Sequence, residues 1–501
     1  MQFILSAALF FIVSSKAADV TCPKGPITSN GAFPATGIAP FPANYGCAME
    51  FNIPNGQIIK FMSQSNAVNE NVDRMTIMDS AGTLYEMASG EALLYTPANY
   101  SKLWIQTKTD TANFYISWQY IDVTKYTKVW NPTGTILPLN LTSKSYYQFF
   151  SNQSQVVFHI GNLDRNNDPY LFNIYVYDGE DLNSRYIGTL SDLIQKPTLT
   201  GSTRNSLVLV NYYGSKSKSW GIANDWAAIA PYKDYNLIVM SQGIDYTYNA
   251  YIPDGLQSAI TFYCIDSSES YITSLTLKDR SNGRQFVAFS PLTPTNNYPQ
   301  LLTYNVNTQI SQSLPQQILS NTFTMVLYHC ETQLTISSGP LFIWTLAVPG
   351  RTGQIFSPSA WNPLTFNQKP YSTNFSKKLQ SSLDKGLSIS ASTQKLKFTF
   401  NFGYLIINNP TEQINIEIGS SDSQPFSLGF NHTALNIGTQ EAYGTYMSTS
   451  FTGKTLMSEF AMTFRMESNA TTTPAPVETT TKSSAVILNI SLLTLFIAKL
   501  F

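Results

Sequence analysis

The chain has little charge and very little histidine. Only 12% of its 501 residues are charged, 30 Lys and Arg against 31 Asp and Glu give a formal net charge of −1, and three residues are histidine. No excess of positive charge is present to attract nucleic acid or anionic lipid. The scarcity of histidine leaves few side chains for acid–base chemistry near neutral pH or for metal binding.

Sequence motifs with a known chemical mechanism are missing or incomplete. The chain has neither a G-x-S-x-G nor an H-E-x-x-H motif. Residues 452–455 resemble the end of a phosphate-binding loop, but Ser448 stands where the first glycine is required. Asp164–Asp168 resembles the start of an EF-hand loop, but Pro169 and Tyr175 replace its glycine and its bidentate glutamate. Neither segment is predicted to bind the usual ligand.

Helical periodicity is also nearly absent. Residues 190–196 and 313–319 could each form a helical turn or two. Elsewhere apolar residues alternate with others, as in 114–120 and 460–466, which is typical of strands that present one face to a core. The pattern predicts an all-β chain of tandem antiparallel β-sandwiches.

A weak internal repeat suggests the number of sandwiches. An apolar strand leads into an Asp- and Gly-containing turn at 75–82, 174–179 and 275–283. This spacing favours sandwiches of about 100 residues each, although any β-rich sequence contains such turns by chance. The predicted domains comprise residues 18–123, 124–232, 233–348 and 349–467.

The two ends of the chain predict export and a lipid anchor. Residues 1–17 resemble a signal peptide, with small residues before the expected cleavage site. A Thr/Pro spacer at 468–484 and an apolar tail at 485–501 resemble a glycosylphosphatidylinositol (GPI) signal, with Asn469 as the candidate anchor residue. A transmembrane helix is the alternative, but it needs about 20 apolar residues. Plain secretion is the third possibility.

Four cysteines, an even number, predict two disulfides in an oxidising compartment. Three pairings are possible, and we favour Cys22–Cys47 with Cys264–Cys330 because each bond then stays within one predicted domain. A zinc site is a poorer explanation, since no C-x-x-C pair exists. Six N-x-S/T sequons predict N-glycosylation on surface loops and strand ends. Their asparagines are Asn99, Asn140, Asn152, Asn374, Asn431 and Asn469.

Residues 22–122 resemble the nematode CUB-like domain proteins. The resemblance rests on five features: Cys22-Pro23, the stretch 41–45 before Cys47, the Ile53–Gly56 turn, the Asp79–Gly82 turn and the aromatic strand Phe114–Trp118. It implies CUB-like jelly-roll sandwiches in a secreted or lipid-anchored protein. Several members of the family are linked to pathogen response, and no enzymatic activity is ascribed to the family as such.

The resemblance also raises a calcium site, because conventional CUB domains often bind calcium at one end. Glu50, Asp73 and Asp79 are the available carboxylates. The simpler interpretation is an exposed glutamate and a turn-forming aspartate. Likewise, Trp220 and Trp226 could stack on sugars, or they could fill the core between two domains.

His159, His329 and His432 are interpreted as structural or surface residues. The sequence as a whole predicts a non-enzymatic cell-surface protein that acts in recognition, adhesion or defence. We expect an extracellular protein or glycan ligand, membrane contact through the lipid anchor, no cofactor and no nucleic-acid partner. The alternatives are a structural glycoprotein of the surface coat and an extracellular glycan hydrolase with an unrecognised carboxylate pair.

Overall fold

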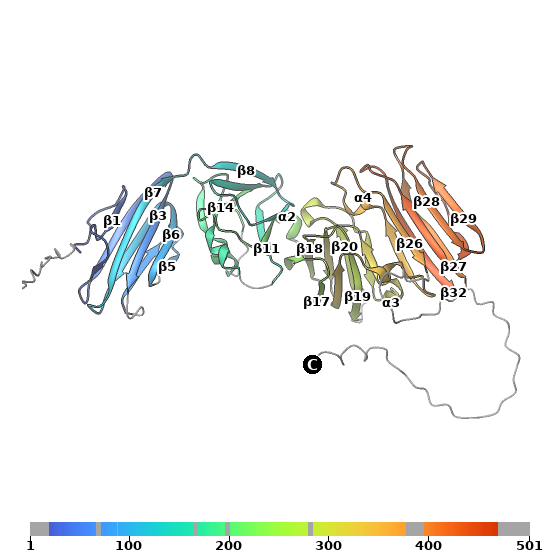
Figure 1. The fold of residues 1–501 in the computed structure, drawn as a ribbon, viewed down its shortest axis with the longest axis horizontal. Coiled ribbons are helices and arrows are strands. Elements are labelled where there is room, and N and C mark those ends of the chain that lie inside the picture. Colours follow the sequence, from blue (N-terminus) through green and yellow to red (C-terminus); the bar gives the residue numbers. More distant parts are fainter. Residues whose placement is uncertain are drawn as a thin grey trace, which may run out of the picture.

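The computed structural model describes residues 20–66, 72–87, 89–164, 168–195, 201–278, 284–376 and 395–468. Strands form almost all of its regular structure, and Figure 1 shows them in sandwiches that follow one another along an elongated molecule. The expected all-β fold is therefore confirmed. The helical elements are short: η1 (Pro169–Asn173), α1 (Leu190–Ile194), α2 (Trp226–Ile229), η2 (Pro294–Asn296), α3 (Ile310–Ser313), η3 (Phe342–Thr345) and α4 (Pro358–Trp361).

Of the two segments expected to be helical, only one is. The segment 190–196 contains α1, which Thr189 caps through a hydrogen bond from the backbone N–H of Asp192. The segment 313–319 instead forms a strand, β22 (Gln316–Ile318). Pro315 explains the difference, because proline disfavours helical geometry in the residue before it and lacks the N–H that a helix needs.

The strands of the first sandwich are connected by hydrogen bonds into a single sheet. Its strands are β1 (Gly31–Phe33), β2 (Ala39–Pro40), β3 (Gly46–Asn66), β4 (Arg74–Met78), β5 (Leu84–Glu86), β6 (Gly90–Gln106) and β7 (Asn113–Asp122). They pair in the order β1-β7-β3-β6-β4-β5, with β2 beside β7. The two longest strands, β3 and β6, run through both layers: β7 pairs with one half of β3, and β4 pairs with one half of β6. The pairing of β3 with β6 shifts register between Ile53 and Ile58, so the expected 53–56 turn is an irregularity within β3. Phe51 and Phe61, one on each side of it, pack edge to face with ring centroids 5.0 Å apart.

The second sandwich has one sheet of five strands and one of three. Its strands are β8 (Thr127–Pro132), β9 (Ile136–Pro138), β10 (Ser145–Phe150), β11 (Val156–Gly161), β12 (Ile174–Asp178), β13 (Arg185–Thr189), β14 (Ser206–Asn211) and β15 (Trp220–Asp225). The orders are β13-β12-β14-β10-β8 and β11-β15-β9, and only the β8–β10 pair of these sheets is parallel. Phe149 and Phe158 meet between the sheets, 5.3 Å apart.

The third and fourth sandwiches each have two sheets. The third pairs β16-β18-β23-β20-β21 and β17-β24-β19-β22, and the fourth pairs β25-β32-β27-β30 and β26-β31-β28-β29. The third contains β16 (Asp234–Met240), β17 (Asp245–Tyr251), β18 (Gln257–Cys264), β19 (Ser270–Lys278), β20 (Phe286–Pro291), β21 (Leu302–Asn305), β22, β23 (Thr322–Tyr328) and β24 (Glu331–Ser338). The fourth contains β25 (Thr352–Phe356), β26 (Tyr371–Ser376), β27 (Leu396–Ile406), β28 (Ile414–Ser420), β29 (Ser423–Phe430), β30 (Gln440–Gly444), β31 (Tyr446–Phe451) and β32 (Glu459–Ser468).

The domain ranges predicted from the sequence stay a prediction, and none of their inner limits lies within a strand. Residues 123, 232 and 348 lie after β7, before β16 and before β25 respectively. In the part of the chain that the structure describes, no sheet combines strands from two sandwiches. That each sandwich also folds as an independent unit stays a prediction.

Buried side chains nevertheless join neighbouring sandwiches. At the first junction, Ile58 and Tyr95 share a cluster with tyrosines of the second sandwich, and the Tyr175 hydroxyl donates to the Tyr95 carbonyl at 2.7 Å. At the second junction, β11 lies so close to β16 that a Cβ on Gly161 would stand 2.7 Å from the Leu237 carbonyl oxygen. At the third junction, Trp361 belongs to the core cluster of the third sandwich. The molecule is therefore one continuously packed array.

We expect Trp361→Ala to loosen the third junction. Trp361 is completely buried, and removing a buried tryptophan side chain costs about 3–5 kcal/mol. Trp130, which is 58% exposed, provides the matched control, and Trp130→Ala should leave stability nearly unchanged. Chemical denaturation combined with limited proteolysis between β24 and β25 measures both effects. Equal stability of the two variants would contradict the shared core.

Candidate functional site

The first predicted disulfide is present. Cys22 and Cys47 are bonded, with their Cα atoms 5.4 Å apart. The bond ties the N-terminal segment to the start of β3 and closes a sequence separation of 25 residues. In the chain-entropy description a loop of this size stabilises the fold by about 3 kcal/mol.

The second predicted disulfide, Cys264–Cys330, is wrong. Both residues are buried thiols. The backbone N–H of Cys264 donates to the Asn321 carbonyl just before β23, whereas Cys330 follows the other end of that strand. At about 3.3 Å per residue, this places the two residues roughly 20 Å or more apart, and a disulfide requires Cα atoms within about 7 Å. Sharing one domain was therefore not sufficient for pairing.

The sequons that the structure describes all have accessible asparagines. Asn99, Asn140, Asn152, Asn374 and Asn431 are exposed. Asn99 lies on β6 and Asn374 on the edge strand β26, while the other three lie in connections. Asn469, the candidate anchor residue and sixth sequon, lies outside the described residues. Glycosylation at these positions stays a prediction.

The carboxylates considered for calcium do not converge. Asp73 and Asp79 lie at opposite ends of β4, which separates them by about 20 Å at 3.3 Å per residue. Glu50 is exposed and forms an ion pair with Lys102, with 3.1 Å between Oε1 and Nζ. Within the described ranges, no group of three or more metal-ligating side chains is assembled.

Asp73 and Asp168 instead hold loops in place. Asp73 accepts hydrogen bonds from the backbone N–H groups of Lys108 and Thr109 and from the Thr109 hydroxyl. Asp168 accepts from the hydroxyls of Ser217 and Ser219 and from two backbone N–H groups. Burial opposes ionisation of both side chains, but these hydrogen bonds outweigh it and lower both pKa values.

Glu412 plays the same role in the segment that resembles a phosphate-binding loop. Its Oε1 accepts hydrogen bonds from the backbone N–H groups of Lys454 and Thr455, at 2.7 and 3.1 Å. The Thr455 hydroxyl donates to Oε2. Burial works against ionisation of Glu412, but these bonds lower its pKa. A carboxylate of the chain therefore occupies the donors that a phosphate would need.

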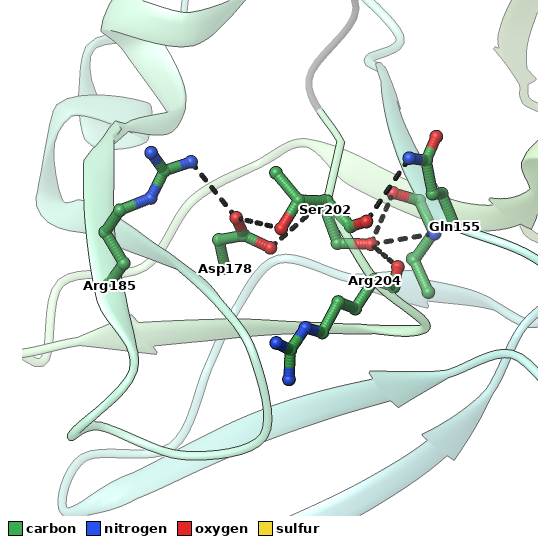
Figure 2. A network of polar contacts seen from close by, with 7 residues as sticks. Gln155, Asp178, Arg185, Ser202 and Arg204 are labelled. Atoms are coloured by element: carbon green, nitrogen blue, oxygen red, sulfur yellow. Dashed lines mark hydrogen bonds and ion pairs between the residues drawn. The ribbon is translucent and has the colours of Figure 1, made fainter.

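Figure 2 shows a polar network that fixes a loop of the second sandwich. Asp178, at the end of β12, accepts from the backbone N–H and the hydroxyl of Thr203 at 2.7 and 2.8 Å and pairs with Arg185 at 3.1 Å. Gln155 donates to the Thr203 carbonyl at 3.3 Å. The network joins the β12–β13 hairpin to residues 201–205, which is a structural role.

The tryptophans occupy different environments. Trp220 is partly buried at the second junction, where its ring lies 4.8 Å from that of Tyr263. The interpretation as a core residue between two units therefore holds for Trp220. Trp226, at the start of α2, is 38% exposed and leaves part of its ring accessible.

The histidines also differ from one another. His329 is buried, with its Nδ1 3.1 Å from Asp254 Oδ1, and His432 is exposed beside Asn431. His159 packs edge to face on Tyr235, 4.6 Å away, and its Nδ1 is buried without a hydrogen-bond partner. Burial lowers the pKa of His159 to about 4. Because Tyr235 belongs to β16, this contact crosses the second junction.

A pocket of about 370 Å³ opens at the third junction. It is lined by apolar residues and by Ser311, Gln312 and Arg351. Arg351 is only 4% exposed, and it donates to the carbonyls of three lining residues, Ile343, Leu346 and Pro315. Its guanidinium also lies 5.1 Å from the Trp344 ring and 5.4 Å from the Phe375 ring.

This arginine is electrostatically unusual. Burial lowers its pKa to about 10, and its Nε is buried without a hydrogen-bond partner. In the described part of the chain, no carboxylate lies in an ion pair with it. The pocket therefore combines apolar walls with a fixed positive charge, an arrangement suited to an amphipathic anion. Neither the pocket nor the arginine was identified from the sequence, where Arg351 only follows an apolar run.

Comparison with known proteins identifies the first sandwich. Residues 12–124 match the family model of the CUB-like domain, so a CUB-like domain is present. No curated protein matches the chain. The expected nematode source stays a prediction. A CUB-like domain with a disulfide fits an extracellular protein.

Solved structures align only loosely. The CUB1-EGF-CUB2 domains of rat MASP-1 align with 63% of this chain and 99% of that one, at 7% identity and a TM-score of 0.18. The CUB1-EGF-CUB2 domain of human MASP-1/3 aligns with 60% of this chain and 99% of that one, at 6% identity and a TM-score of 0.16. The full extracellular region of zebrafish Gpr126/Adgrg6 aligns with 90% of this chain and 53% of that one, at 9% identity and a TM-score of 0.18. With TM-scores this low, we infer nothing about this chain from the three alignments.

We expect the buried residues Cys264 and Cys330 to react only after unfolding. Burial raises the pKa of the Cys264 thiol, and the thiolate is the reactive form. Alkylation of the native protein should modify neither Cys264 nor Cys330, and alkylation in denaturant should modify both. Peptide mass spectrometry without reduction should find Cys22 joined to Cys47. A peptide pair joined through Cys264 and Cys330 would contradict the structure.

Acid should weaken the second junction through His159. A histidine with a lowered folded-state pKa contributes stability that is fully present above about pH 6.5 and lost as the pH falls towards about 4. Because the residue is partly exposed, we expect a loss of about 1–3 kcal/mol. Stability measured from pH 7.5 to 4 should fall less steeply in His159→Gln than in the parent. His432→Gln, at an exposed histidine, should follow the parent, and parallel profiles for all three would exclude the effect.

Proposed function

We propose that the protein is a non-enzymatic recognition protein of the cell surface that acts in adhesion or defence. The observation that carries the proposal is a CUB-like domain at one end of a continuously packed array of sandwiches. Its ligand would be an extracellular protein or glycan. Loops on a rigid scaffold supply the binding surface in proteins of this kind.

The arrangement of the ends supports this proposal. Figure 1 places the first sandwich at one extreme of the molecule and the fourth at the other. The described chain ends at Ser468 on β32, immediately before the candidate anchor residue. An anchor there would attach the fourth sandwich to the membrane, at the opposite extreme of the molecule from the CUB-like domain. Apolar junctions would limit bending between those ends.

The proposal includes a GPI anchor and N-linked glycans. Exposure of the five described sequon asparagines makes them accessible to glycosylation. Among the described residues, no helix has the length and apolar character needed to cross a bilayer. Glycans would also supply surface polarity to a chain in which only 12% of residues are charged.

No observation specifically favours the alternatives. A hydrolase would need a pair of carboxylates free to act on substrate, whereas Asp73, Asp168 and Glu412 accept several hydrogen bonds from their own loops. A purely structural coat protein would need no specific ligand. Saturable binding separates it from a recognition protein.

The anchor is tested by treating cells that express the full chain with a phosphatidylinositol-specific phospholipase. We expect release of a glycosylated ectodomain into the medium. A variant that ends at Ser468 serves as the control, because it should be secreted without treatment. Retention of the treated full chain would contradict a cleavable lipid anchor.

Recognition is tested with the released ectodomain. We expect saturable binding to target cells, with loss of binding when either surface protein or surface glycan is removed enzymatically. That comparison identifies the ligand class. Binding that rises linearly with concentration would favour the coat-protein alternative, and turnover of a glycan substrate would favour the hydrolase.

A further inference from the structure

An uncharged apolar segment lies exposed at the third junction. Residues 339–350, called the apolar loop below, contain no charged side chain. Phe342 is 66% exposed, Ile343 37% and Val348 46%. A concentration of exposed apolar side chains in one loop usually marks a surface that another apolar surface covers.

The residues around the apolar loop are also mostly apolar and uncharged. Ile343, Leu346 and Val348 line the pocket described above, together with Leu314 and Pro315 of an adjacent segment. That segment, residues 309–315, is also uncharged. The nearest charge in sequence is Arg351, whose guanidinium lies among the lining residues without a carboxylate partner in the described chain.

The loop lies where the described chain ends. Gly350 N–H donates to the Met466 carbonyl, and Met466 N–H donates to the Arg351 carbonyl, both at 2.8 Å. Strand β32 continues for only two residues beyond Met466. At about 3.3 Å per residue, these residues span roughly 7 Å. An anchor at Asn469 would therefore hold the apolar loop close to the membrane surface.

We propose that the apolar loop rests in the interfacial region of the outer leaflet. The boundary between head groups and acyl chains would take up the side chains of Phe342, Ile343 and Val348. The positive charge of Arg351, which lies beneath the apolar loop, would attract lipid phosphate. The inference rests on the lipid anchor proposed above. Apolar side chains beside a positive charge suit this interface, and a second contact would orient the array relative to the membrane.

A second apolar group at the opposite end of the same sandwich provides a control. Leu435 is 83% exposed, Phe366 77% and Met457 67%. Met457 precedes β32, whereas the anchor would follow its end. These residues should therefore remain in water when the apolar loop contacts lipid.

The test uses the full chain, purified with its anchor and reconstituted in phosphatidylcholine vesicles. Val348→Cys and Leu435→Cys are each labelled with an environment-sensitive fluorophore, and the parent protein, whose thiols are buried, serves as the labelling blank. We expect blue-shifted emission at position 348, quenched by lipids with a nitroxide near the head group, and neither effect at 435. Adding Phe342→Ser should reduce the effects at 348, whereas Phe366→Ser should not.

Each other outcome would overturn the inference. Vesicle flotation reports on the anchor separately, so a chain that floats without a shift at 348 refutes the loop contact alone. A chain that does not float refutes the anchor and the contact together. A shift at 435, or at both positions, would mean that the fourth sandwich has no such orientation. A shift at 348 without vesicles would mean that a second copy or another segment of this chain covers the loop.

Discussion

The structure depends on apolar side chains that are buried between successive sandwiches. A sandwich of about 100 residues covers most of its apolar surface with its own two sheets, but its ends stay open. Here the next sandwich covers them, through Tyr175 on Tyr95, Val239 beside Val157, and Trp361 within the third core. Without these contacts the same four units would be separate domains on linkers, and their ends would have no fixed relation.

Tyrosine is the main residue of the first junction for a physical reason. Its ring supplies large apolar area, and its hydroxyl satisfies a polar group within the contact. The hydroxyls of Tyr177 and Tyr212 hydrogen-bond to each other at 2.6 Å, and Tyr85 reaches both Asp79 and, across the junction, Asp192. Burial raises the pKa of Asp79 and of these tyrosines. The tyrosine and aspartate side chains named here are therefore hydrogen-bonded within the junction.

Several of the few acidic side chains serve the interior rather than the surface. Asp73, Asp168 and Glu412 each gather donors from a loop that has no regular secondary structure to satisfy its N–H groups. This use explains why short resemblances to metal- and phosphate-binding loops do not form such sites.

The sequence by itself determined features that depend on local pattern. Alternation of apolar residues specified strands, because side chains on a strand point to opposite faces. The expectation that a disulfide stays within one predicted domain gave the Cys22–Cys47 bond. Only the tertiary structure decided the features that join distant positions. Cys264 and Cys330 share a sandwich, yet β23 separates them, and Arg351 became notable only when residues 315, 343 and 346 surrounded it. Such relations follow from strand register and from packing between sheets, which local sequence patterns do not encode.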